Sequence, residues 1–305
     1  MFKYSQCQLS KDDDILVAIS GIAKVVERSM NDEYLAGLWR STLLIDLLWS
    51  TKRSQWPTEN ISATRLIPFR APTWSWASIK GQVWPSDHYC LPDIDTDRNP
   101  LVIFVAEMVD IRIEATTDDQ TGQVDKGFLS IRSSIFNGVF GKPWEGLEEN
   151  LLIQIGHYEF CGFVYIDDLE AMESCKGKKD TDILCMPICM QGPRLIDHEK
   201  GLESIGLNEE FESSSDEEQT QERESDNEVE DDAGRITLKG LALAPVEDCE
   251  GHFVRIGVFI VVRQAKLGSQ FPWYYGRNDL HTNECEYREF QLEYERINKT
   301  LVVLV

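Results

Sequence analysis

The chain has 305 residues, 42% of them hydrophobic, which is enough for one large domain or two small ones. Its formal net charge of −23 disfavours sequence-independent binding to nucleic acid or anionic lipid. There is neither a run of 18 apolar residues nor a secretory signal. We therefore expect an intracellular protein, most simply a cytoplasmic one, with its eight cysteines reduced and no membrane contact.

Residues 12–29 have the spacing of an amphipathic helix. The apolar residues that fall on one face are Ile15, Ile19, Ile22 and Val26. Asp12–Asp14 lie where the helix dipole favours negative charge. A metal site built from these three aspartates is disfavoured, because neighbouring side chains on a helix diverge.

A second, shorter helix is predicted at residues 41–49. Ser41 or Thr42 can cap it, and leucines follow almost without interruption up to Trp49. A helix that is apolar over most of its circumference should be buried. Residues 50–70 have no period and two prolines, so we expect an irregular connection there.

The segment Ala71–Ser78 carries two tryptophans two residues apart, directly after Pro72. In an extended chain Trp74 and Trp76 would point to the same side and cover a large apolar area. We interpret the pair as an anchor where the helical part meets the rest of the chain. The alternative is a stacking platform for sugars or bases, although Lys/Arg clusters do not flank it.

After Gly81 the hydrophobic pattern changes to the two-residue period of half-buried strands. Residues 109–115 and 129–132 alternate in this way, and the polar run at 118–122 indicates a hairpin between them. The other strand candidates are 151–155, 163–166, 183–188, 236–243, 253–262 and 301–305. We therefore predict an α+β fold, in which a small helical part (residues 1–84) packs on a mainly antiparallel β sandwich or barrel-like domain (residues 85–305).

An acidic segment at residues 199–234 interrupts the β region. Residues 203–232 alone hold fourteen Asp or Glu and one Arg, with too few apolar side chains for a core. This composition predicts a disordered insertion. Four serines that precede acids are candidate phosphorylation sites: Ser213, Ser214, Ser215 and Ser225. A passive, variable insertion explains the segment equally well.

No set of residues in the sequence has the spacing of a known reaction centre. The best metal candidates are Cys175, Cys185, Cys189 and His198, but they lack the tight C-x2-C spacing of structural zinc sites. The pair His88 and Cys90 is weak support for a nucleophilic couple. Asp167 and Asp168 follow an apolar run, where carboxylates usually end a strand. We predict no catalytic residue, cofactor or metal.

Three stretches together resemble fungal heterokaryon-incompatibility (HET-domain) proteins. They are Ile19-Ser20-Gly21-Ile22-Ala23, Tyr34–Trp39 with Leu47-Leu48-Trp49, and Arg70–Ser78. The signature residues of this resemblance are Tyr34, Gly37, Leu38, Trp39, Trp49, Pro72, Trp74 and Trp76. In that family this order of motifs lies directly downstream of the HET domain. The match spans residues 4–84, with a looser similarity at 240–245 and 255–259.

The resemblance implies the region C-terminal to a HET domain, without the HET domain itself. The expected function is a non-catalytic interaction or regulatory module, taking part in self/non-self recognition (vegetative incompatibility) with full-length relatives as partners. Two alternatives stay open. The chain could be a non-functional fragment of a HET-domain protein, or a carbohydrate-binding or hydrolytic β domain that uses Trp74 and Trp76.

Overall fold

The computed structural model describes most of the chain outside the acidic segment. The described residues are 2–7, 9–51, 63–67, 69–86, 101–140, 150–168, 170–171, 181–192, 236–247, 249–263 and 284–305. The predicted disordered insertion at 199–234, with its four candidate serines, lies outside them.

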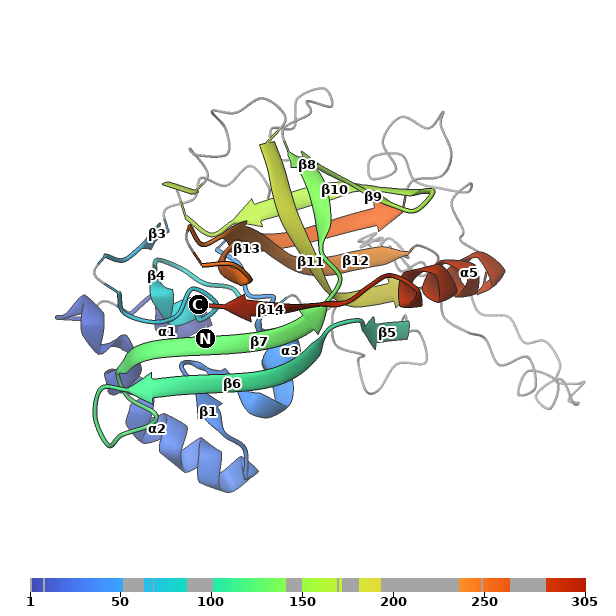
Figure 1. Cartoon of the computed structure of the whole chain (residues 1–305). Coiled ribbons are helices and arrows are strands. Elements are labelled where there is room, and N and C mark those ends of the chain that lie inside the picture. The colour runs from blue at the N-terminus through green and yellow to red at the C-terminus, as the bar shows by residue number, and fades with distance from the viewer. Residues whose placement is uncertain are drawn as a thin grey trace, which may run out of the picture.

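The N-terminal part, residues 2–86, consists of short elements around one longer helix (Figure 1). The helices are α1 (Phe2–Ser5), α2 (Ile15–Met30) and α3 (Leu43–Asp46), with 3-10 turns η1 (Asp12–Asp14), η2 (Arg40–Thr42) and η3 (Trp76–Ser78). The strand pairs are β1 (Tyr34–Leu35) with β2 (Leu38–Trp39), and β3 (Thr64–Arg65) with β4 (Ile79–Lys80). The predicted second helix is thus only one α-helical turn after a 3-10 turn, but its apolar residues are mostly buried, as expected.

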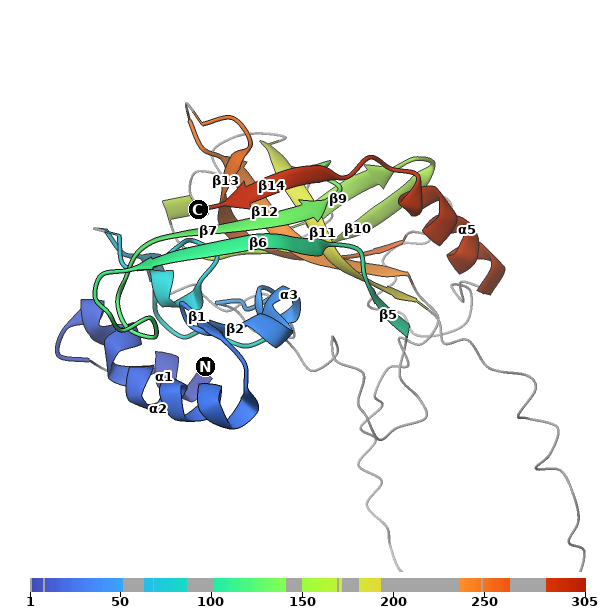
Figure 2. The ribbon, with the colours of Figure 1, turned by 60° about the horizontal axis from the view of Figure 1, so that its bottom comes forward.

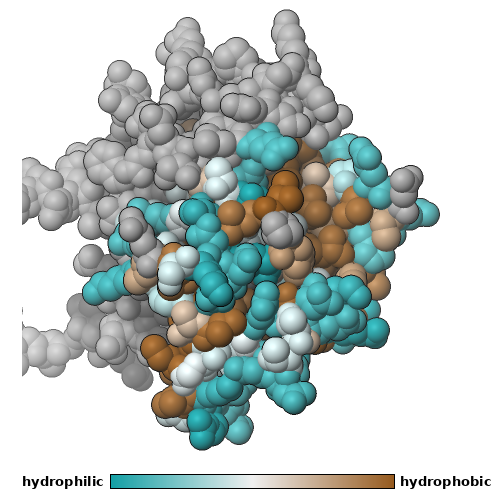
Figure 3. Space-filling view, turned by 90° about the vertical axis from the view of Figure 1, so that its left-hand side faces the viewer, coloured by the Kyte–Doolittle hydropathy of each residue, from teal (hydrophilic) through white to brown (hydrophobic). Residues whose placement is uncertain are grey.

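The helix face that holds Ile15, Ile19, Ile22 and Val26 is buried only in part. Ile15 is buried, but Ile22 is 66% exposed, and the inward face is completed by Leu16, Ser20 and Ala23. The helix carries apolar residues around more than one face, so its period alone did not decide which side packs. Exposed apolar side chains remain on its outer side. Figure 3 shows hydrophobic surface among hydrophilic side chains on the side where α1 and α2 lie.

Six antiparallel strands close into a barrel. They are β8 (Phe136–Phe140), β9 (Asn150–Ile155), β10 (Tyr158–Ile166), β11 (Thr181–Gly192), β12 (Thr237–Pro245) and β13 (His252–Arg263). Closure occurs because β10 pairs with β9 on one edge and with β13 on the other. The predicted α+β class, with helices on a mainly antiparallel barrel-like sheet, is confirmed.

Three further strands extend the sheet from β13 over the N-terminal part (Figure 2). The first two residues of β13 pair in parallel with β14 (Thr300–Leu304). Next come β7 (Val124–Ser133) and finally β6 (Glu107–Ala115), which form the predicted hairpin. A short strand, β5 (Leu101–Phe104), pairs with the end of β11.

The two faces of the barrel strands contribute to two apolar clusters. Side chains from all six barrel strands meet in one, the barrel interior, together with Tyr287, Phe290 and Tyr294 of α5 (Glu284–Glu295). Figures 1 and 2 show α5 at the opposite end of the molecule from α2. The other cluster joins the N-terminal part to β7, β11, β12, β13 and β14.

None of the helices among the described residues has both the length and the apolar character of a membrane span.

An ion pair attaches α2 to the loop of the β6–β7 hairpin. Lys24 Nζ lies 2.7 Å from Asp119 Oδ2, and the backbone N–H and Oγ1 of Thr121 donate to Asp119 Oδ1. Hydrogen bonds from Lys24 and Thr121 lower the pKa of Asp119 to about 2. Because this pKa is depressed, the stabilisation is present above the unfolded-state pKa of about 4 and is lost as the pH falls towards 2.

We predict that Lys24→Met raises the pKa of Asp119 towards its ordinary value, because the first and largest hydrogen bond to the carboxylate is removed. Carboxyl NMR titration of Asp119 measures this directly. Lys126→Met, which removes a neighbouring exposed ion pair to Glu114, should leave Asp119 unchanged. A wild-type pKa near 4 would contradict the prediction.

Candidate functional site

The segment Ala71–Ser78, which we call the Trp motif, forms hydrogen bonds with two separate segments. Ser75 Oγ donates to the carbonyl of Ala36 and accepts from the backbone N–H of Ala77 at 3.0 Å. Trp76 Nε1 donates to Gly37 O at 2.7 Å, and Trp49 Nε1 donates to Trp74 O at 2.9 Å. These bonds hold the β1–β2 turn and the segment after α3 against the motif.

The two indoles of the motif contact different elements. The Cα of Gly127 on β7 lies against Pro72 and Trp74, whereas Gly37 in the β1–β2 turn lies against Trp76. The expectation that Trp74 and Trp76 point to the same side assumed an extended chain, but the backbone enters the 3-10 turn η3 at Trp76. Trp74 and Trp76 are 0% and 2% exposed. No ring face is therefore open for stacking a sugar or a base.

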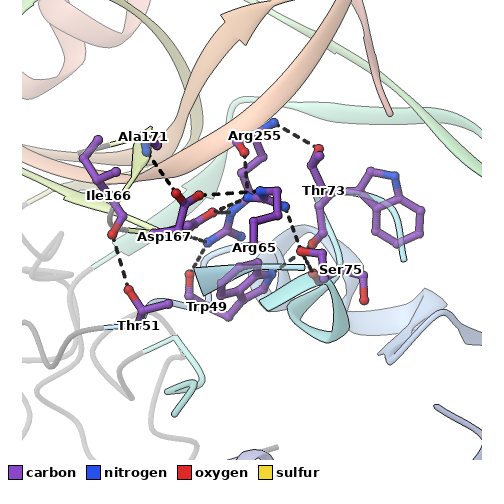
Figure 4. Close-up of polar contacts among 12 residues, drawn as sticks. Trp49, Thr51, Arg65, Thr73, Ser75, Ile166, Asp167, Ala171 and Arg255 are labelled. Atoms are coloured by element: carbon purple, nitrogen blue, oxygen red, sulfur yellow. Dashed lines mark hydrogen bonds and ion pairs between the residues drawn. The ribbon is translucent and has the colours of Figure 1, made fainter. Parts of the chain in front are cut away.

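A polar cluster that joins the N-terminal part to the barrel is centred on Arg255 of β13, which is fully buried. Its Nε and Nη2 donate to the two carboxylate oxygens of Asp167 at 2.9 and 3.0 Å, a bidentate ion pair (Figure 4). Nη1 and Nη2 also donate to the carbonyls of Leu47 and Trp49. The guanidinium carbon lies 3.4 Å from the centre of the Trp49 ring. We call this set the Arg255 junction.

A second arginine and a threonine complete the Arg255 junction. Arg65 Nη2 donates to Arg255 O at 3.1 Å, and Nη1 donates to Ser78 Oγ at 2.8 Å. Arg65 also lies 3.6 Å from both Asp167 and Asp168. Thr73 Oγ1 accepts from the backbone N–H of Arg255 and donates to the carbonyl of Val305. Segments that lie far apart in the sequence therefore meet in one set of bonds.

The electrostatics of the Arg255 junction are those of a structural contact. Burial lowers the pKa of Arg255, and the charge of Asp167 opposes that shift. An arginine with this partner stays protonated at neutral pH. Arg255 therefore cannot serve as a general acid or a general base. Both charged side chains are 0% exposed and bonded to the protein on every side described. The arrangement is therefore a buried structural contact between segments of the fold.

Sequence reasoning missed this ion pair. Asp167 and Asp168 do follow the end of β10, as predicted, but Asp167 also neutralises Arg255, 88 residues away. One signal was available. Arg255 stands within the otherwise apolar run 253–262, and a charge in a buried strand requires a buried partner.

The two metal candidates that the structure describes, Cys185 and Cys189, do not come together. Cys185 and Cys189 are both buried on β11, but one belongs to the barrel interior and the other to the cluster beneath the N-terminal part. They cannot share a metal ion from opposite faces of a strand. Burial raises the pKa of the Cys185 thiol, as expected for a core residue. Cys175, His198, His88 and Cys90 lie outside the described residues.

The described part of the chain offers few other candidate sites. It holds no group of three His, Cys, Asp or Glu placed to bind a metal. An open depression lies on the outer face of the β6, β7 and β14 strands, lined by Arg112, Phe128 and His252 among others. Neither Trp74 nor Trp76 borders it.

Comparison with known proteins adds no further assignment. No family model, no curated protein and no solved structure matches the chain. The resemblance to HET-domain proteins therefore rests on the sequence motifs, mainly those of residues 4–84.

We predict that Arg255→Met lowers the free energy of unfolding by about 3–5 kcal/mol, because it leaves the buried Asp167 carboxylate without its main partner. Urea unfolding measures the loss. The double variant Arg255→Met with Asp167→Leu should recover part of it, since both buried charges are then gone. Arg132→Met, which breaks an exposed pair with Glu107, should cost less than about 1 kcal/mol. Equal losses for Arg255→Met and Arg132→Met would refute the assignment.

The contact between Gly37 and Trp76 gives a second prediction. Gly37 has φ +101°, and a Cβ there would lie 2.6 Å from Trp76 Nε1. Gly37→Ala should therefore lower the unfolding free energy by about 1–3 kcal/mol. Gly21→Ala is the matched control, because Gly21 is exposed on α2 with open space around it. That change should stabilise by about 0.5–1 kcal/mol in the same denaturation assay. The assignment fails if both alanines act alike.

Proposed function

We propose that the protein is a non-catalytic interaction module of the HET type, and that it binds its partner through the outer face of α2. The observation that carries this proposal is a stripe of exposed apolar and small side chains on α2. Its members, which we call the α2 stripe, are Val17, Ala18, Gly21, Ile22 and Val25.

The α2 stripe has the character of a binding surface. Val17, Ile22 and Val25 are 46%, 66% and 61% exposed, and they follow one another along a single helix face. Exposed apolar side chains that are contiguous and bordered by charge mark sites of protein contact. Asp13 and Asp14 lie at one end of the stripe and Arg28 at the other.

The helix that presents the stripe is fixed in place before any partner arrives. Lys24 attaches it to Asp119, and Glu27 Oε1 accepts from the backbone N–H of Tyr34. On its inner side Leu16 is 1% exposed. A preformed surface of this kind loses little conformational entropy on binding.

The resemblance supplies the class of partner. Gly21 and Ile22 of the Ile19–Ala23 motif are exposed in the stripe, while Ser20 and Ala23 of the same motif face inward. Most of the signature residues are buried, which gives them a structural role. We therefore propose a full-length HET-family protein as partner, an intracellular location, and a role in self/non-self recognition.

Co-purification with full-length relatives tests this proposal. The double variant Ile22→Glu with Val25→Glu should weaken association at least tenfold, because two carboxylates would be desolvated in the contact. Leu292→Glu, on an equally exposed apolar residue of α5, should leave it unchanged. Absence of association by the wild-type chain, or equal binding by both variants, would refute the proposal.

A further inference from the structure

The outer border of the sheet is formed by β6. The path of paired strands ends there, and among the described residues β6 pairs only with β7 (Figure 1). Its inward side chains Met108, Ile111 and Ile113 are only half-buried, whereas Leu129 and Ile131 of β7 are completely buried. A strand with one unpaired edge and incompletely covered apolar side chains can accept a further strand.

The charges on β6 define which strand it can accept. Asp110, Arg112 and Glu114 stand on the outer face, and Val109 occupies a β-bulge and is 42% exposed. The side chain of Arg112 is 79% exposed, and it pairs with Asp110 of its own strand at 2.8 Å. The order acid, base, acid at alternate positions is complementary to a copy of itself in one antiparallel register.

Two registers can be compared by the residues that they place opposite each other. A two-fold axis at Arg112 would set arginine against arginine and Asp110 against Glu114, which is repulsive. An axis at Ile111 sets Asp110 of each copy against Arg112 of the other, with Ile111 against Ile111. Opposite charges and apolar pairs across neighbouring strands are both favourable.

We propose that two copies of this chain associate through β6, antiparallel and centred on Ile111, so that the two sheets become continuous. The two-fold axis makes the contact self-complementary, since both Asp110–Arg112 pairs form at once. A single strand pair buries less area than a stable dimer interface of about 1,200 Å² or more. The association is therefore weak and concentration-dependent, and the net charge of −23 opposes it at low salt.

This inference stands on residues separate from the α2 stripe and does not rest on the proposed function. Substitutions in the α2 stripe leave self-association unchanged, and substitutions on the β6 edge leave binding of a HET-family partner unchanged. Failure of one proposal is thus distinguishable from failure of the other.

Sedimentation velocity of the full chain at 0.15 M salt, over a series of protein concentrations, tests the dimer. The wild-type chain should move from monomer towards dimer as concentration rises. Asp110→Arg sets arginine against arginine, and Arg112→Asp sets aspartate against aspartate, so each variant alone should dimerise at least tenfold more weakly. Both side chains are exposed, so the fold of each variant is retained.

Mixing the two variants is the decisive measurement. An equimolar mixture of Asp110→Arg and Arg112→Asp restores an opposite-charge pair at both positions, so dimer should reappear at the wild-type level. Lys299→Asp carries the same change in net charge as Arg112→Asp, away from β6, and should behave as wild type. A wild-type chain that stays monomeric at every concentration, a dimer unaffected by Arg112→Asp, or a mixture that stays monomeric would each overturn the proposal.

Discussion

The need to neutralise one buried arginine organises this molecule. Arg255 lies in a central strand with no access to solvent, where an unpaired charge would cost several kcal/mol. Its partners are the Asp167 carboxylate at the end of β10 and two carbonyls of the segment after α3. Asp167 neutralises the charge within the barrel, and the two carbonyls from the N-terminal part accept further N–H groups of the same guanidinium, so Arg255 joins the two parts.

The tryptophan motif acts together with this junction. Trp49 stacks on the guanidinium of Arg255 and donates its N–H to the motif, so one residue belongs to both networks. Trp74 and Trp76 extend the contact to β7 and to the β1–β2 turn, and in both cases a glycine permits the close approach. The residues that carry the family resemblance are thus mostly those that fix the N-terminal part on the sheet.

The residues of the Arg255 junction and of the tryptophan motif are largely buried, so interaction is left to the surface. Two surfaces emerge from the same architecture for different reasons. The α2 stripe exists because the helix is apolar on more sides than the core can cover. The β6 edge exists because the sheet continues past the closed barrel and has to end at some strand. The first surface is apolar and helical, whereas the second offers backbone hydrogen bonds with a charge pattern that selects its partner.

The sequence by itself determined the elements whose signals are local. Alternation at 109–115 and 129–132 gave the β6–β7 hairpin, and the apolar run before Trp49 gave a buried segment. Only the tertiary structure decided which face of α2 is buried, where the two indoles point, and that Asp167 pairs with Arg255. These depend on contacts between segments many tens of residues apart, as does the pairing of β10 with β13 that closes the barrel. Periodicity specifies that a residue packs, but its partner is set by chain topology, which no local pattern encodes.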